Sequence, residues 1–119
     1  MRSAIHVLED DIDISELITL LLAEQGYDVA VFNSIASFKH RAGESLPALL
    51  IIDIMLPDGN GLDICRAWKT NRSTSHVPIL LMSAYEDYRL DSRAGYADGF
   101  ISKPFDIKAF LTEVQQQLK

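Results

Sequence analysis

The sequence contains little cysteine, proline or glycine, and it has no long uninterrupted apolar run. Its single cysteine, Cys65, excludes an internal disulfide and suits a cytoplasmic protein, whose thiols stay reduced. The longest apolar stretch, residues 46–56, is interrupted by Pro47 and Asp53 and is far shorter than the roughly 20 residues that span a bilayer. The chain also reaches Glu9 before the apolar region of a signal peptide is complete. We therefore expect a cytoplasmic protein without a membrane segment.

Positive charge is scarce as well. Lys and Arg number 11 against 17 Asp and Glu, which leaves a formal net charge of −6. Since phosphate backbones are bound by clustered Lys and Arg, this balance argues against direct binding of nucleic acid. An acidic surface suits a cation or a basic protein partner instead. A length of 119 residues with 48% hydrophobic residues is typical of one compact domain, so we expect a single domain over residues 1–119.

Short apolar runs alternate along the chain with segments of helical periodicity. The run at residues 49–52 has no polar alternation, which is typical of a central strand covered on both faces. Asp13 can cap the helix after the first strand, and Gly26 can end it. The expected strands span residues 4–8, 28–32, 49–52, 77–82 and 100–101, and the regular helices begin near Asp13, Ser34, Leu62 and Ile107.

This alternation predicts an α/β fold with a doubly wound, five-stranded parallel sheet and helices on both faces, two on one side and three on the other. The third helix carries Cys65 and Trp68 three residues apart, which indicates packing against the sheet. The segment 86–93 has little apolar periodicity beyond Tyr88 and Leu90. We therefore expect the fourth helix to be short or irregular.

The chemically distinctive residues all lie where a strand is expected to end. In an open parallel sheet, ligands bind outside the carboxyl ends of the strands, where the strand order reverses. For the flavodoxin-like order 2-1-3-4-5, the reversal lies between the first and third strands. The residues at the expected strand ends are Glu9, Asp10 and Asp11 after the first, Asp53 after the third, Ser83 after the fourth and Lys103 after the fifth.

Several carboxylates in one crevice need a compensating charge. Two such charges about 4 Å apart repel each other by roughly 4 kcal/mol at an effective dielectric near 20. A hard divalent cation relieves this repulsion, and oxygen ligands with retained waters suit Mg²⁺. Lys103 would add a point charge and Ser83 a hydroxyl donor. A cation, an ammonium group and a donor around the Asp53 carboxylate can stabilise a phosphoryl group in transfer.

The motifs at these strand ends resemble those of response-regulator receiver domains, the CheY-like domains of bacterial two-component signalling. They come in the order typical of that family, and the resemblance covers essentially the whole chain. The matching runs are Val7-Leu8-Glu9-Asp10-Asp11, Ile51-Ile52-Asp53-Ile54-Met55-Leu56-Pro57-Asp58-Gly59-Asn60-Gly61, Leu81-Met82-Ser83-Ala84 and Ser102-Lys103-Pro104-Phe105.

The resemblance implies a role for each matching position. Asp53 corresponds to the phosphoacceptor. Glu9 and Asp10, with Asp53 itself and the backbone carbonyl of Met55, correspond to the ligands of Mg²⁺. Lys103 corresponds to the lysine that pairs with the phosphoryl group, and its bond to Pro104 to the family's cis peptide.

Two further positions correspond to the switch of the family. Ser83 matches the hydroxyl residue that turns toward the phosphoryl group, and Phe100 matches the aromatic residue that then fills the vacated space. The surface formed by the fourth helix, fifth strand and fifth helix would be repacked as a result. For Phe100, plain core packing remains the alternative.

The implied partners are a sensor histidine kinase or histidine phosphotransfer protein, and a downstream effector domain or protein. A homodimer that forms on phosphorylation is a further option. The Asp53 carboxylate would attack the phosphorus atom of a phosphohistidine in line and form an acyl phosphate. The domain would thus catalyse its own phosphorylation and a slow hydrolysis, without being a conventional turnover enzyme. Hydrolysis would be slow because Met55 and Tyr85, which would flank the path of an attacking water, are both large.

Other interpretations of the same residues remain open. Asp11 can simply mark a helix start or support the metal ligands. Taken alone, Ser83 could be a simple hydroxyl at a strand end and Lys103 a surface lysine. A receiver-like interaction module that is never phosphorylated is the main alternative function. An aspartate-nucleophile phosphatase is disfavoured because it needs a second acid where this chain has Met55. A flavodoxin is disfavoured because no Ser/Thr/Gly-rich phosphate loop follows the first strand.

Overall fold

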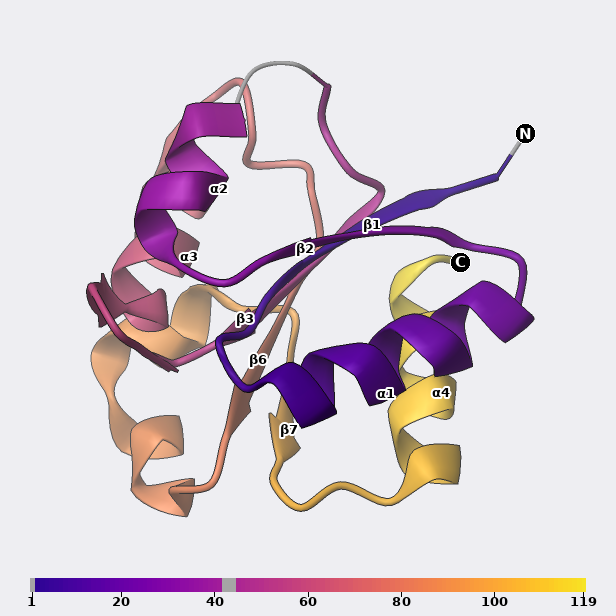
Figure 1. Cartoon of the computed structure of the whole chain (residues 1–119). Helices are drawn as coiled ribbons and strands as arrows, with labels where there is room; N and C mark the ends of the chain where they lie inside the picture. Colours follow the sequence, from indigo (N-terminus) through magenta and orange to yellow (C-terminus); the bar gives the residue numbers. More distant parts are fainter. Residues whose placement is uncertain (1, 42–44) are drawn as a thin grey trace.

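The computed structural model describes residues 2–41 and 45–119, which alternate between strands and helices (Figure 1). Most of the elements lie where the apolar periodicity predicts them. In chain order they are β1 (Ala4–Leu8), α1 (Ile12–Glu24), β2 (Asp28–Phe32), α2 (Ile35–Arg41), β3 (Leu49–Asp53), β4 (Met55–Leu56), β5 (Gly59–Asn60), α3 (Gly61–Thr70), β6 (Ile79–Ser83), η1 (Glu86–Leu90), η2 (Ser92–Tyr96), β7 (Gly99–Ser102) and α4 (Ile107–Gln117).

A five-stranded parallel sheet forms the centre of the molecule. Its order is β2-β1-β3-β6-β7, which confirms the predicted order 2-1-3-4-5, because β6 and β7 are the fourth and fifth strands of this sheet. All five residues of β3 are buried, as expected for a strand covered on both faces. Leu8 of β1 pairs with Ile52 of β3, so the residues that follow each of them lie at the same edge of the sheet.

Helices cover both faces of the sheet (Figure 1). On one face α1 and α4 pack against β1, β3 and β6, and their fully buried contributions to the core are Ile18, Leu22, Phe110 and Val114. On the other face lie α2 and α3, where buried Cys65 and partly buried Trp68 pack as predicted. Among the described helices, none has the length and apolar character needed to cross a bilayer.

The segment between β6 and β7 confirms the predicted irregular fourth helix. It forms two short 3₁₀ helices, η1 and η2, neither of which has a buried residue. Its partly buried contacts with the core are Tyr88, Ala94 and Ala97, whereas Leu90 is 87% exposed. A segment with so few apolar anchors cannot bury a continuous helical face, and it remains a pair of separate turns.

The first helix corrects one detail of the sequence prediction. Asp11, and not Asp13, is its N-cap, because the Asp11 side chain accepts a hydrogen bond from the backbone N–H of Ile14. Asp13 lies in the first turn, where a carboxylate is still favourable. Gly26, with φ of 89°, follows the end of the helix in a conformation that favours glycine.

A short hairpin follows β3 and was not predicted. Met55 and Leu56 in β4 pair antiparallel with Asn60 and Gly59 in β5, and the turn consists of Pro57 and Asp58. The run of turn-forming residues at 57–61 predicts a loop but not the two-residue ladder. The hairpin directly follows the candidate phosphoacceptor, so its position shapes the site.

Candidate functional site

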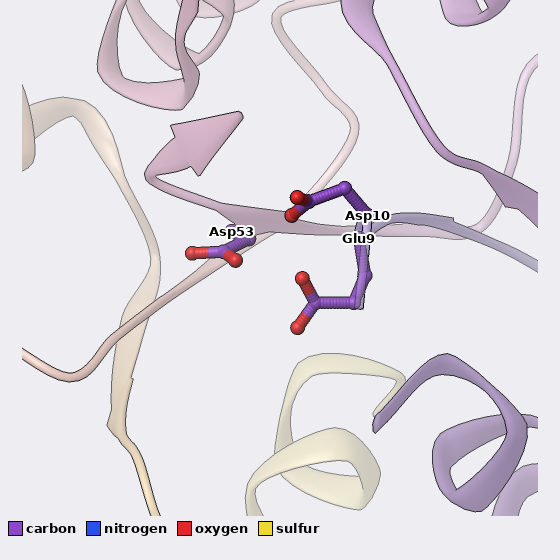
Figure 2. A group of neighbouring side chains, drawn as sticks. All are labelled: Glu9, Asp10 and Asp53. Atoms are coloured by element: carbon purple, nitrogen blue, oxygen red, sulfur yellow. The ribbon is translucent and has the colours of Figure 1, made fainter. Parts of the chain in front are cut away.

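Three carboxylates from two neighbouring strands gather at the carboxyl edge of the sheet (Figure 2). Glu9 and Asp10 follow β1, and Asp53 ends β3. One oxygen from each of the three lies within 4.8 Å of the others. Glu9 and Asp53 are buried, whereas Asp10 is exposed. The three carboxylate residues predicted as metal ligands are therefore brought together by the pairing of β1 with β3.

Lys103 places its ammonium group among these acids. Its Nζ donates hydrogen bonds to Glu9 Oε1 at 2.5 Å and to Asp53 Oδ2 at 2.9 Å. The backbone N–H of Lys103 donates to the carbonyl of Ser83 at 2.8 Å, which attaches the end of β7 to the end of β6. The Lys103–Pro104 peptide bond is cis, as the family resemblance implies. The ammonium group in this cluster of acids thus comes from a residue 50 positions beyond Asp53.

The electrostatics of the cluster reflect an excess of buried negative charge. The pKa of Glu9 is raised to about 7, first by burial and then by the contact with Asp53, while Lys103 acts in the opposite direction. Burial alone would lower the pKa of Lys103, but its hydrogen bonds to Glu9 and Asp53 outweigh that effect and raise it. One ammonium group does not neutralise three carboxylates. An all-oxygen donor set with this surplus charge fits a hard divalent cation such as Mg²⁺.

The Asp53 carboxylate is held at both of its oxygens. Oδ2 accepts from Lys103, and Oδ1 accepts from the backbone N–H of Met55 at 3.3 Å. Behind it, Gly61 at the start of α3 packs so tightly that an added Cβ would overlap the backbone oxygen of Asp53 and approach Ile52 Cγ2 to 2.6 Å. The two hydrogen bonds restrain the orientation of the carboxylate, and the packing of Gly61 restrains the backbone that carries it.

Ser83 is buried at the end of β6, and its hydroxyl oxygen accepts a hydrogen bond from the backbone N–H of Tyr85 at 2.9 Å. The hydroxyl proton is therefore still available to donate to another group. The two large residues that the sequence predicts above the site, Met55 and Tyr85, are 52% and 57% exposed. Together with Tyr88 and Leu90 they line an open surface depression of about 630 Å³.

Phe100 lies in β7, where it packs against the core on the α2 and α3 side. The guanidinium of Arg89 lies 4.2 Å above its ring, in cation–π geometry. Arg89 also forms an ion pair with Glu86 at 2.7 Å, and Glu86 in turn accepts a hydrogen bond from the Ser102 hydroxyl. Sequence patterns do not predict this contact of η1 with β7. An Arg and a Glu three residues apart look like an ordinary solvated pair, and nothing local in the sequence points to Phe100 or Ser102.

Comparisons with known proteins agree on one family. Residues 5–115 match the family model described as "Response regulator receiver domain". The DNA-binding response regulator MtrA of Mycolicibacterium paratuberculosis is 35% identical over 122 aligned positions, which cover 100% of this chain and 52% of that protein. The response regulator ArlR of Staphylococcus saprophyticus is 34% identical, over 97% of this chain and 52% of its own length. The chain thus spans about half the length of the curated relatives it matches.

Solved structures have the same fold. A putative response regulator from Chloroflexus aurantiacus superposes with a TM-score of 0.91 at 23% identity, over 99% of this chain and 98% of that one. The response regulator TrrA of Thermotoga maritima, in complex with Mg²⁺ and BeF, superposes with a TM-score of 0.89 at 26% identity, over 99% of this chain and 100% of that one.

Proposed function

This chain belongs to the response regulator receiver family, and on that premise we propose that it accepts a phosphoryl group on Asp53 in the presence of Mg²⁺. The observation that carries the proposal is the position of Lys103. Its ammonium group lies within hydrogen-bond distance of Glu9 and Asp53, in a cluster that also includes Asp10. This arrangement combines a nucleophilic carboxylate, a fixed positive charge and a set of oxygen ligands for a cation.

We assign the metal ligands as follows. Glu9, Asp10 and Asp53 would hold Mg²⁺ through carboxylate oxygens, and Met55 through its backbone carbonyl. The bound cation would supply positive charge for the phosphoryl oxygens during transfer. The exposed side chain of Asp10 keeps one side of the cluster open to solvent. Mg²⁺ usually retains several waters, and an open side suits that preference.

The proposed phosphodonor is the phosphohistidine of a sensor kinase or of a histidine phosphotransfer protein. An Asp53 oxygen attacks phosphorus as the bond from phosphorus to the imidazole nitrogen breaks, and that nitrogen keeps the electron pair and takes up a proton. The product is an acyl phosphate on Asp53. Lys103, which now contacts Asp53, would pair with the phosphoryl oxygens, and Ser83 would donate its free hydroxyl proton to one of them.

The proposed output is a change of the surface formed by η1 and η2, β7 and α4. Movement of Ser83 toward the phosphoryl group would make room for Phe100, whose ring now lies under Arg89. We propose that this surface acts on an effector domain or protein, or pairs with a second copy of the chain. The relatives described as DNA-binding have about twice this length, so contact with DNA would be a task of an additional domain. As in the family, the work would take place in the cytoplasm.

A labelling experiment tests the proposal. The protein is incubated with MgCl₂ and a small acyl phosphate or phosphoramidate, and intact-mass spectrometry follows the addition of one phosphoryl group. We expect labelling of the wild type, none of Asp53→Asn, and none when EDTA replaces MgCl₂. Asp106→Asn is the matched control, since it removes an exposed carboxylate but keeps a good N-cap for α4.

The outcomes separate the two functions that the sequence leaves open. A folded wild type that is never labelled, by small donors or by a phosphorylated histidine protein, would support the unphosphorylated interaction module. Labelling that persists in Asp53→Asn would mean that another residue is the acceptor. Loss of labelling in Asp106→Asn would show that the effect is not specific to Asp53.

A further inference from the structure

The carboxylate of Asp58 links the hairpin that carries Met55 to α2 through hydrogen bonds. Asp58 lies in the turn between β4 and β5. Its Oδ1 accepts a hydrogen bond from the backbone N–H of Ile35 at 2.8 Å, and its Oδ2 accepts one from Ala36 at 2.9 Å. These partners lie 23 and 22 residues away in the sequence. Asp58 thus caps a helix to which it does not belong.

The local cap of α2 satisfies only one of the first backbone N–H groups of the helix. Ser34, the residue before the helix, accepts from the backbone N–H of Ser37 through its hydroxyl at 3.1 Å. The first amides of a helix have no partner within the helix itself, and a cap from the preceding residue satisfies only one of them. Without Asp58, the backbone N–H groups of Ile35 and Ala36 would donate only to solvent, and the Asp58 carboxylate accepts hydrogen bonds from both. A carboxylate at this end of a helix is also favoured by the helix dipole.

Apolar contacts hold the same hairpin against α2. A Cβ added at Gly59 would come within 2.6 Å of Ile35 Cδ1, so the turn and the helix pack without a gap. Leu56 is buried in the same cluster as Phe38 of α2. The hairpin and the start of α2 therefore form one packed unit, and Asp58 provides its polar contacts.

The other end of this unit reaches the phosphoacceptor. Met55, three residues before Asp58, donates its backbone N–H to Asp53 Oδ1 at 3.3 Å. Gly61, directly after β5, donates to the carbonyl of Ile54 at 2.7 Å and closes the hairpin. A shift of the turn relative to α2 would therefore move the backbone of Met55 relative to the Asp53 carboxylate.

We propose that Asp58 is a positioning residue for the Mg²⁺ site, because its hydrogen bonds to Ile35 and Ala36 attach the metal-binding hairpin to α2. The inference rests on the proposed function, in which the Met55 carbonyl is a ligand of Mg²⁺. Asp58 acts through the backbone of Met55 and does not touch the cation. Coupling between two sites is reciprocal, so bound Mg²⁺ also stabilises the first turn of α2.

The first test is the affinity for Mg²⁺, measured by titrating MgCl₂ into the isotope-labelled protein and following the backbone amide resonances. We expect Asp58→Ala to weaken binding by roughly five- to tenfold, in the range of typical coupling between sites. Asp58→Asn keeps one oxygen acceptor and should lie between Asp58→Ala and the wild type. Thr74→Ala is the control, since it removes a hydrogen bond of 2.7 Å to the Trp68 carbonyl at the far end of α3. Its affinity should stay within about twofold of the wild type.

The second test is hydrogen exchange at the amides of Ile35 and Ala36. In the wild type and in Thr74→Ala, saturating MgCl₂ should slow exchange at both amides, whereas in Asp58→Ala it should leave their exchange unchanged. A merely structural cap would protect these amides to the same extent with and without Mg²⁺. Should Asp58→Ala fail to fold, Asp58→Asn provides the same comparison.

The results distinguish failure of this inference from failure of the proposed function. Equal Mg²⁺ affinity of the wild type and Asp58→Ala would overturn the role of Asp58 and leave the phosphoacceptor proposal intact. A loss in Thr74→Ala as large as in Asp58→Ala would also overturn it, because general destabilisation would then explain both. A folded wild type that does not bind Mg²⁺ would overturn the metal site and this inference together.

Discussion

The central strand β3 and the segment formed by η1 and η2 are held in place in different ways. The strand that ends in Asp53 is buried along its whole length and pairs with a strand on each side. The segment formed by η1 and η2 has no buried residue. Burial of apolar surface and a ladder of backbone hydrogen bonds fix the position of the Asp53 backbone. By contrast, η1 and η2 are held in place by contacts at the surface of the molecule.

Charged side chains provide much of what holds η1 and η2. Arg93 pairs with Asp63 of α3 and with Asp91, each at 2.8 Å, and Arg89 reaches β7 through the ring of Phe100. An exposed ion pair contributes about 0–1 kcal/mol and is weakened by salt. The molecule therefore combines a rigidly packed central strand with a weakly held surface segment. A small free energy is enough to rearrange such a segment.

The largest expected effect comes from a cavity in the rigid region. Ile51, in the middle of β3, is fully buried, and Ile51→Ala should lower the free energy of unfolding by about 2–5 kcal/mol. Leu90→Ala is the matched control in the segment, because its side chain is 87% exposed and its loss should change stability by less than about 0.5 kcal/mol. Urea unfolding followed by circular dichroism measures both. Equal losses of stability in Ile51→Ala and Leu90→Ala would contradict the difference in packing between β3 and η1.

Alanine substitutions of two glycines test the same difference in packing. Gly61→Ala places a methyl group against Ile52 and the backbone of Asp53, and should cost about 1–3 kcal/mol of stability. Gly95→Ala in η2 meets no atom within 4 Å and should cost nothing measurable. Thermal unfolding compares the two variants with the wild type. If Gly61→Ala were as stable as Gly95→Ala, the tight packing behind Asp53 would not be needed for stability.

Met55 and Tyr85 lie at the boundary between the two regions, where both line the surface depression. Replacing Met55 by Asn should let an attacking water be oriented by a side-chain amide and accelerate decay of the acyl phosphate about tenfold, which corresponds to about 1.4 kcal/mol in the barrier. Decay is followed on protein phosphorylated by a small donor and then freed of it. Leu90→Asn, which adds the same amide at the outer edge of the depression, should decay as the wild type does. Unchanged decay in Met55→Asn would refute the idea that residue size slows hydrolysis.

The smallest effect is a pH dependence confined to the weakly held segment. Hydrogen bonds from the Arg93 side chain and backbone lower the pKa of Asp91 from its ordinary 3.8 to about 2. A lowered pKa means that the carboxylate stabilises the fold above pH 3.8, and that this contribution is lost as the pH falls toward 2. The protection factors of the backbone amides should therefore fall in η2 over this pH range before they fall in β3. Asp91→Asn should remove the pH dependence of exchange in η2, and its persistence there would assign the effect to other groups.

The sequence predicts the five strands and the general position of the candidate site because both depend on local patterns. Continuous apolar runs mark buried strands, and each distinctive polar residue directly follows such a run. The prediction was wrong on the cap of α1, where Asp11 and Asp13 are equally suitable by residue type and differ only in backbone geometry. It also missed the contacts of Asp58 with Ile35 and Ala36, and that of Arg89 with Phe100. Their partners lie far away in the sequence, so no local pattern indicates them.

Hydrophobic periodicity and strand length are local properties of the chain, so they are enough to predict which segments are buried and which side chains end each strand. How those ends meet depends on the packing of whole elements. The register of β1 with β3 brings three acids within reach of one cation, and the end of β7 places Lys103 between Glu9 and Asp53. These distances depend on how whole elements pack against each other, and packing depends on residues throughout the chain.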